Sequence, residues 1–150
     1  MKKIDNFSGD FEFLSNFSPH SFRDETETLW RTNEHFYQAW KTLKFSERGR
    51  IWSASTPGRA KKLGQEVTLR ADWLFTKFDV MKRGLELKFA QNDDIRELLI
   101  QTDGYHLVEG NRWHDNIWGS CNCHKCWGTP GSNWLGILLM ELRKEIIDGE

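Results

Sequence analysis

The sequence predicts an α+β fold: a single compact, mainly helical domain over residues 1–150, with a small β region at its N-terminal end. Three observations favour this class. Apolar residues recur at intervals of three and four in the middle and at the end of the chain, which is typical of helices that bury one face. Aromatic residues near the N-terminus alternate, which is typical of short strands. No linker or repeat interrupts the 150 residues, a length sufficient for one hydrophobic core.

The N-terminal region is predicted to be β structure. Phe11, Phe13 and Phe17 stand at strand-like spacing before a Ser-Pro turn. Residues 21–23 and 28–30 then flank an acidic segment, so we expect them to pair as a hairpin with a charged tip.

A helix that ends at Leu43 is predicted next. Thr32 or Asn33 can cap its start, because the side-chain oxygen of either residue can accept a hydrogen bond from a first-turn backbone N–H. Its apolar face consists of Phe36, Ala39, Trp40 and Leu43. Its polar face consists of an acid, an amide and an amine: Glu34, Gln38 and Lys41. This polar face is either a solvated helix surface or the wall of a cleft.

Helical periodicity and capping signals predict the rest of the fold. Thr56 can cap a helix that begins at Pro57, a residue with no N–H to leave unpaired. Asn133 is expected to cap the last helix, which is apolar over most of its circumference and should be buried. The remaining elements are predicted as helices at 45–52, 57–64, 73–92, 93–103 and 134–147, a strand at 105–109 and a loop at 110–133.

The composition excludes several classes of protein. Lys+Arg 21 against Asp+Glu 22 gives a net charge of -1, so any contact with nucleic acid should be local. No apolar run approaches the roughly 18 residues of a membrane span, and the N-terminus lacks an apolar signal-peptide region. A cytoplasmic protein with no membrane partner is therefore expected.

A basic segment at the start of the helix at 57–64 can bind phosphate. The unbonded N–H groups of a first helical turn would lie close to Arg59, Lys61 and Lys62, a combination that favours anions. The glycine spacing of a nucleotide-binding P-loop is absent. An ordinary surface helix is the alternative interpretation.

The second candidate region is the aromatic, glycine-bordered loop at 110–119. Asp115 lies between Trp113 and Trp118, where a carboxylate can orient a ribose hydroxyl or a water molecule and an indole can stack on a flat ring. In the alternative interpretation, Asp115 closes an Asx-turn and the tryptophans fill the core.

Three cysteines are crowded into one segment and form no disulfide framework. We interpret Cys121, Cys123 and Cys126 as free thiols and expect no metal or other cofactor. The alternative is a zinc site that these cysteines make with the more distant His114, since His124 lies beside a ligand in sequence and would strain to share the ion.

Nine segments match one known family in their order along the chain, among them E-H-F-Y-Q-A-W-K at 34–41 and D-N-I-W-G at 115–119. They are residues 9–17, 34–41, 58–64, 70–73, 80–85, 88–92, 107–109, 115–119 and 133–136. They resemble the NADAR family of YbiA-like N-glycosidases over nearly the whole chain. The chain departs from the family's pattern at Ser120–Ser132, which is longer than the usual glycine-rich segment and contains the cysteines.

The resemblance implies an α+β fold and a hydrolase that cleaves N-glycosidic bonds of ribosylated amines. One group in the family acts on phosphorylated ribosylamino-pyrimidine intermediates of riboflavin synthesis. Another removes ADP-ribose from the amino group of guanine, in some cases as the antitoxin to a DNA-modifying ADP-ribosyltransferase. The expected partners are therefore ADP-ribosylated guanine, in DNA or as a nucleotide, or a ribosylated pyrimidine, together with a cognate ADP-ribosyltransferase toxin.

The resemblance also implies site residues. The catalytic positions are Glu34, Lys41 and Asp115. The substrate-binding positions, besides the basic residues at 59, 61 and 62, are Asn16, Phe17, Trp73, Trp118, Gly119 and Asn133. We expect the helix at 34–41 to face a cleft that it shares with Trp73 and the Asp115 loop.

Two mechanisms are open. In the first, Glu34 or Asp115 protonates the leaving nitrogen or activates water, while the other carboxylate stabilises an oxocarbenium-like state. In the second, Lys41, with a lowered pKa, attacks the opened sugar and forms a Schiff base. A continuous helix would place Lys41 about 10 Å along the axis from Glu34. The alternatives from other classes are a module that binds ADP-ribose without cleaving it and a small zinc-linked interaction domain.

Overall fold

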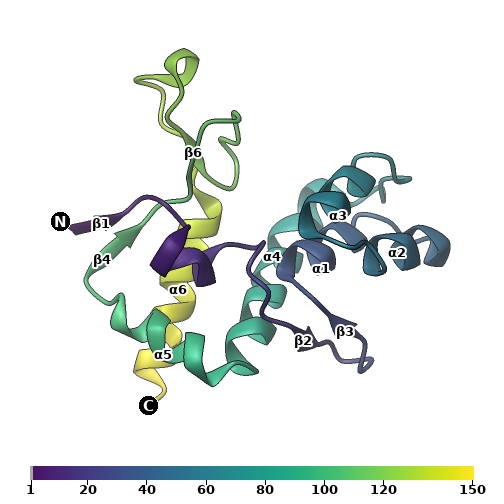
Figure 1. Cartoon of the computed structure of the whole chain (residues 1–150), viewed down its shortest axis with the longest axis horizontal. Helices are drawn as coiled ribbons and strands as arrows, with labels where there is room; N and C mark the ends of the chain where they lie inside the picture. The colour runs from purple at the N-terminus through teal and green to yellow at the C-terminus, as the bar shows by residue number, and fades with distance from the viewer. Residues whose placement is uncertain (1) are drawn as a thin grey trace. The chain divides into compact units, whose positions relative to one another are not determined.

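The structure is a computed structural model that describes residues 2–150 (Figure 1). These residues divide into two compact units. Unit 2 is Asn16–Asp93, and unit 1 combines the residues up to Ser15 with Asp94–Glu150. Helices predominate over a few strands of two or three residues, so the predicted α+β class is confirmed. The single domain over the whole chain stays a prediction.

Unit 2 begins with the predicted hairpin. Strands β2 (Phe22–Arg23) and β3 (Leu29–Trp30) pair antiparallel, with Phe22 opposite Trp30. Both of these rings are buried and pack edge-on against Phe36, at centroid distances of 5.5 and 5.7 Å. The hairpin is thus anchored to the helix that follows it by edge-to-face aromatic contacts.

Helix α1 (Asn33–Ala39) begins as predicted but ends earlier. Thr32 Oγ1 accepts a 3.1 Å hydrogen bond from the amide of His35, which confirms the predicted cap. The predicted extension to Leu43 is wrong, because the amide of Lys41 bonds to the carbonyl three residues back and tightens the chain into a turn. Leu43 is therefore exposed and no part of an apolar face.

Three helices, all confirming predictions, pack around α1: α2 (Phe45–Trp52), α3 (Pro57–Gly64) and α4 (Trp73–Ala90). The predicted cap of α3 is also confirmed, since Thr56 Oγ1 accepts a 3.0 Å hydrogen bond from the amide of Arg59. All 7 residues of α1 are buried, the polar ones included. The polar face of α1 is therefore not a solvated surface.

Two glycines allow α3 and α4 to approach α1 closely. A Cβ atom at Gly64 of α3 would overlap the side-chain amide of Gln38, and a Cβ atom at Gly84 of α4 would overlap that of Asn33. Each glycine thus leaves space for one polar side chain of α1. The polar residues of α1 are as tightly enclosed as its apolar ones.

Unit 1 contains two short parallel strand pairs. Strand β1 (Lys2–Ile4) pairs with β4 (Tyr105–Leu107), which confirms the first part of the strand predicted at 105–109. Strand β5 (Gly110–Asn111) pairs with β6 (Ser120–Cys121), so the loop predicted at 110–133 is wrong for these four residues.

The N-terminal aromatic segment is not a strand, contrary to the prediction. Gly9–Leu14 form a 3₁₀ helix, η1, in which the adjacent residues Phe13 and Leu14 are both buried. Neighbours in a strand point to opposite faces, whereas neighbours in a helical turn can both reach a core. Gly9 opens the segment with a φ of 57°, a conformation that favours glycine. The spacing of Phe11 and Phe13 therefore reflects a helical turn.

Helices α5 (Asp93–Gln101) and α6 (Trp134–Asp148) confirm the two predicted C-terminal helices. Asn133 precedes α6, but the prediction that its side chain caps the helix is wrong. Asn133 adopts a left-handed conformation with φ 53°. Its side-chain Oδ1 accepts a 3.0 Å hydrogen bond from the backbone N–H of Glu109, and its Nδ2 donates one of 2.8 Å to the carbonyl of Leu107. None of the helices in the described part of the chain is long and apolar enough to cross a membrane.

Candidate active site

The predicted catalytic carboxylate lies in the first turn of α1. Glu34 is 6% exposed, and Gln38, one turn later, donates a 3.0 Å hydrogen bond from Nε2 to Oε1 of Glu34. Gln38 is also buried, yet its own Oε1 has no hydrogen-bond partner within residues 2–150. That oxygen packs against Gly64 of α3, where a Cβ atom would overlap it. The hydrogen bond from Gln38 therefore fixes the Glu34 carboxylate inside unit 2.

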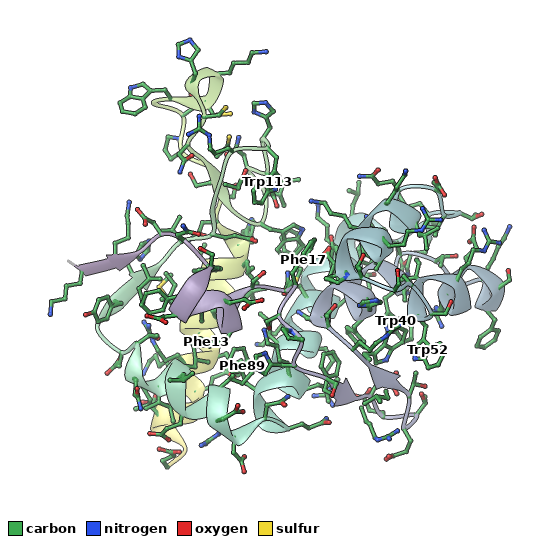
Figure 2. The ribbon with its side chains drawn as sticks, in the orientation of Figure 1. Phe13, Phe17, Trp40, Trp52, Phe89 and Trp113 are labelled. Atoms are coloured by element: carbon green, nitrogen blue, oxygen red, sulfur yellow. The ribbon has the colours of Figure 1, made fainter. Side chains whose placement is uncertain are left out.

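An amide pair holds the start of α1. Asn33 Nδ2 donates a 2.8 Å hydrogen bond to Asn16 Oδ1, and the amide of Glu34 donates to the carbonyl of Asn16 at 3.0 Å. Asn16 Nδ2 faces the sulfur of Met81 at 3.4 Å. Asn16 thus positions Glu34 from within unit 2, and its contact with substrate stays a prediction. Phe17, the next residue, is 41% exposed, and its contact with substrate also stays a prediction (Figure 2).

His35, beside Glu34, has a structural role. Its Nε2 lies 3.0 Å from the carbonyl of Ala54, which can only accept, so Nε2 carries the proton. Its Nδ1 lies 2.7 Å from the hydroxyl of Thr32. Burial lowers the pKa of His35, the Ala54 carbonyl opposes this, and the positive charge of Arg31 adds to the lowering. The lowered pKa favours the neutral imidazole, and both of its ring nitrogens are bonded inside unit 2.

Lys41 is partly buried just beyond the end of α1. Burial lowers the pKa of its amine, the Glu34 carboxylate opposes this effect, and the positive charges of Lys61 and Lys77 lower the pKa further. Lys41 therefore loses its proton to form the neutral amine more easily than an exposed lysine does. Because α1 ends between Glu34 and Lys41, the axial spacing expected from a continuous helix does not apply. We refer to Lys41, Lys61 and Lys77 as the lysine cluster.

Two aromatic rings support Lys41. Its Nζ lies 5.8 Å from the ring centroid of Tyr37, and that ring lies 5.2 Å from Trp73 at an interplanar angle of 54°. The carbonyl of Lys41 accepts a 2.8 Å hydrogen bond from the amide of Arg70. Trp73 is 6% exposed, so almost all of its indole is used inside unit 2. The structure thus gives Trp73 a supporting role, and its stacking on a base stays a prediction.

The basic residues of α3 differ in their positions. Lys61 acts on Lys41, as described above, whereas the side chains of Arg59 and Lys62 are exposed. The amide of Arg59 is already bonded by Thr56, so that N–H of the first turn cannot also bind phosphate. Of the three predicted phosphate contacts, Lys61 is the one placed near the candidate nucleophile.

Asp115 closes an Asx-turn in unit 1. Its Oδ1 accepts hydrogen bonds from the amides of Ile117 and Trp118 at 3.1 and 2.9 Å. Asn111 fixes the loop from the other side, since its side chain accepts from the amide of Asp115 at 3.1 Å and donates to its carbonyl at 2.8 Å. The Asx-turn expected in the alternative interpretation is therefore present. The amides of Ile117 and Trp118 both bond to Oδ1 of Asp115 and neither bonds to Oδ2.

The tryptophans of this loop do not fill the core. Trp113, labelled in Figure 2, is 61% exposed, and Trp118 is half-buried. The carbonyls of Ile117 and Trp118 accept 3.0 Å hydrogen bonds from the first two amides of α6. These bonds dock the loop on the helix start and use amides that would otherwise be available to an anion.

Gly119 and Asn133, two predicted substrate contacts, also have packing roles in unit 1. A Cβ atom at Gly119 would overlap the carbonyl of Glu109, so only glycine fits without a shift of the backbone. The amide of Asn133 donates a 3.1 Å hydrogen bond to the carbonyl of Gly119, and its side chain is bonded to the end of β4. Their contacts with substrate stay predictions.

Two contributors to the site were not predicted. The sequence places Gln38 on the polar face of the helix but indicates no role for it. The motifs do not include Lys77, although it lies four residues after Trp73 in α4 and therefore on the same helical face. That spacing is the signal that could have identified it.

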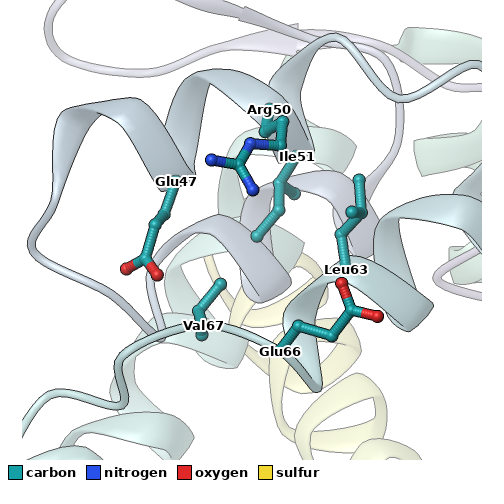
Figure 3. Close-up of a pocket in the computed structure, with 6 residues that line it drawn as sticks. All are labelled: Glu47, Arg50, Ile51, Leu63, Glu66 and Val67. Carbon is teal, nitrogen blue, oxygen red and sulfur yellow. The ribbon is translucent and has the colours of Figure 1, made fainter.

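A pocket on unit 2 is lined by other residues (Figure 3). It is lined by Glu47, Arg50, Ile51, Leu63, Glu66 and Val67. None of the predicted site residues lines it, so we do not assign the chemistry to this pocket.

Comparison with known proteins identifies a matching family model and several relatives. Residues 5–147 match the family model described as the NADAR domain. A protein of Nostoc punctiforme named as an N-glycosidase is 40% identical over 89% of this chain and 84% of its own length. N-glycosidase YbiA of Escherichia coli K12 is 36% identical over 93% of this chain and 84% of its own. The riboflavin biosynthesis protein PYRR of Zea mays is 36% identical over 91% of this chain, which matches only 24% of the maize protein.

A solved structure confirms the fold. The solution structure of E. coli YbiA superimposes with a TM-score of 0.86 and 33% identity, over 99% of this chain and 86% of that chain. The fold and these relatives define a hydrolase of the N-glycosidase class. The chain belongs to the NADAR family.

Proposed function

We propose that this chain hydrolyses the bond between C1 of a ribose and an exocyclic amine, and that it removes ADP-ribose from guanine in DNA or nucleotides in the cytoplasm. A DNA-modifying ADP-ribosyltransferase toxin is its proposed counterpart. The observation that carries the proposal is the partly buried amine of Lys41, electrostatically coupled to the buried carboxylate of Glu34. The lysine cluster around that amine suits the phosphates of ADP-ribose.

The lowered pKa of Lys41 supports the Schiff-base mechanism. A neutral amine attacks C1 of the ribose, the ring oxygen and the exocyclic nitrogen each take up one proton, and the guanine amine leaves. Water then hydrolyses the imine, which regenerates Lys41 and releases ADP-ribose. Glu34 is suited to protonate the leaving nitrogen and to activate the water, because the hydrogen bond from Gln38 fixes its orientation.

The two-carboxylate mechanism is the alternative way to hydrolyse the same bond. In it, Glu34 and Asp115 act as the acid–base and stabilising carboxylates, and Lys41 binds phosphate or a sugar hydroxyl. The Asx-turn uses Oδ1 of Asp115 and not Oδ2, which supports this version. The two mechanisms differ in whether a bond forms between the substrate and Lys41.

A second candidate substrate is a phosphorylated ribosylamino-pyrimidine of riboflavin synthesis. The similarity to the maize riboflavin biosynthesis protein favours it. Its bond also joins ribose C1 to an exocyclic amine, and the lysine cluster suits its single phosphate. The same catalytic residues therefore serve both substrates, and only a direct comparison separates them.

The test is a hydrolysis assay run in parallel on ADP-ribosyl-guanine in DNA, the free ADP-ribosylated nucleotide and the pyrimidine intermediate. Mass spectrometry of the products should show free ADP-ribose and unmodified guanine. Preference for the pyrimidine would establish the second candidate, and no release from any of the three would contradict the proposed function.

Borohydride trapping tests the mechanism. Reduction during turnover should leave a ribosyl adduct that peptide mass spectrometry locates on Lys41. Lys41→Arg, which keeps the charge but has no nucleophilic amine, should form no adduct. Turnover of the unmodified protein without any adduct would support the two-carboxylate mechanism.

A further inference from the structure

We propose that His114, Cys121, Cys123 and Cys126 form a structural zinc site in unit 1. This site is separate from the proposed hydrolysis and supplies none of its reacting groups. The sequence alone leaves a zinc site open as the alternative to free thiols. The structure brings all four residues close together in space. We refer to them as the Cys₃His group.

The distances within the Cys₃His group match a tetrahedral metal site. The candidate ligand atoms all lie within 4.8 Å of one another. Nδ1 of His114 lies 3.4 Å from the sulfur of Cys123, 3.3 Å from that of Cys126 and 3.8 Å from that of Cys121. Zinc bonds of about 2.3 Å to sulfur and about 2.0 Å to nitrogen require nitrogen–sulfur separations of about 3.6 Å. The three observed distances bracket this value, so little rearrangement is needed.

The backbone brings the three cysteines together. Cys121 lies in β6, where its pairing with Asn111 of β5 fixes its position. The chain then turns through the 3₁₀ helix η2 (His124–Cys126), which returns the last cysteine toward the first two. In Figure 2, yellow sulfur atoms gather in this part of the chain beyond β6.

His114 is held in an unusual conformation. Its φ of 67° lies in the left-handed region, one of three such non-glycine residues in the described chain. This conformation costs a non-glycine residue on the order of 1 kcal/mol and persists only where the surroundings favour it. Here it directs Nδ1 toward the three sulfur atoms. The strain is consistent with a role as a ligand.

Hydrogen-bond donors surround the sulfur atoms. The amide of Cys123 lies 3.4 Å from the sulfur of Cys121, and Nδ2 of Asn116 lies 3.6 Å from that of Cys126. Oδ1 of Asn116 in turn accepts a 2.8 Å hydrogen bond from the amide of Cys121. Such donors orient the ligands of a metal and stabilise thiolates.

The set of donors indicates which metal binds and in what role. Three thiolates and one imidazole fill four tetrahedral positions, a combination that suits zinc and leaves no position for a water molecule. The three cysteines would bind as thiolates. The metal would join the two ends of the segment 114–126, which contains Asp115 and Trp118. Its role is therefore to hold this loop in shape.

Metal analysis is the first test. The protein is produced with zinc in the medium and purified under reducing conditions without chelator or an affinity tag. Elemental analysis should then find one zinc ion per chain. Cys123→Ser and His114→Ala should each lose most of the metal. The matched control is His124→Ala, because His124 is an exposed histidine of the same loop that is not in the Cys₃His group.

Two further measurements do not depend on catalytic activity. Cobalt(II) added to zinc-free protein should give thiolate-to-metal absorption and the ligand-field bands of a tetrahedral site, and zinc should abolish both. Removal of zinc should increase cleavage by proteases within 114–126, while circular dichroism shows that the helices remain folded. Metal-free protein with reduced thiols that fails to bind cobalt would overturn the proposal. So would equal loss of zinc from His124→Ala, or a disulfide between Cys123 and Cys126 in protein kept under reducing conditions.

Discussion

Gln38 donates a 3.0 Å hydrogen bond to Glu34 within a helix whose residues are all buried. The bond restricts the carboxylate of Glu34 to one orientation. Gln38 is itself fixed by the close approach of Gly64, where a larger residue would overlap its amide. The polar face of α1 is therefore an internal arrangement of side chains, and its orientation depends on a helix from another part of the sequence.

Replacement of Glu34 by glutamine should lower kcat/KM by about 100-fold or more, the typical contribution of a general acid or base. The fold should survive, because glutamine has the same shape and its side-chain oxygen can still accept from Gln38. Steady-state kinetics and a thermal melt measure the two effects. Glu66→Gln is the control, since Glu66 is an exposed glutamate of the same unit. Wild-type turnover by the Glu34 variant would exclude a catalytic role.

Two glycines of α3 allow a matched test of how Glu34 is positioned. Gly64→Ala should displace Gln38 and cost about 1–3 kcal/mol of stability, the usual cost of overpacking, together with a loss of kcat. Gly58→Ala should be neutral or stabilise by up to about 1 kcal/mol, because its Cβ would meet only Thr56 Oγ1 at 3.9 Å. Chemical denaturation and kinetics on both variants provide the comparison. Equal behaviour of the two would contradict the proposed positioning.

The start of α1 could be predicted from the sequence, but its end could not. The cap at Thr32 is local and has a clear chemical signal. No glycine or proline marks the end of the helix, and the chain is instead held after Ala39 by the hydrogen bond from the amide of Arg70 to the carbonyl of Lys41. A contact between segments so far apart in sequence is not visible in local periodicity.

The candidate site shows the same limit. The resemblance identified Glu34 and Lys41, but burial of the polar face and the effect of Lys77 on Lys41 arise from packing of α1 against α3 and α4. For the Cys₃His group, cysteine spacing alone could not distinguish free thiols from zinc ligands. The approach of His114 depends on its left-handed backbone conformation, which few non-glycine residues adopt and which the cysteine spacing does not predict.

The pH dependence of activity should report the lysine cluster. In the Schiff-base mechanism kcat/KM rises with pH as Lys41 loses its proton, and the lowered pKa of Lys41 places this rise below that of an ordinary lysine. Lys77→Gln removes a positive charge that disfavours protonation, so it should raise the pKa of Lys41 and move the rise to higher pH. Lys44→Gln, at an exposed lysine, should leave the profile unchanged. A profile that does not move in the Lys77 variant would show that another group titrates.

Asp115 can be tested for chemistry separately from structure, because its two oxygen atoms have different surroundings. Asp115→Asn keeps an oxygen that can accept from the amides of Ile117 and Trp118, so the Asx-turn and the stability should be retained. Asp115→Ala removes the turn as well and should cost about 1 kcal/mol or more of stability. If the carboxylate takes part in the reaction, both variants should lose activity by about 100-fold or more at saturating substrate. If Asp115 only shapes the loop, the asparagine variant should be active and the alanine variant impaired, and the two-carboxylate mechanism would then be excluded.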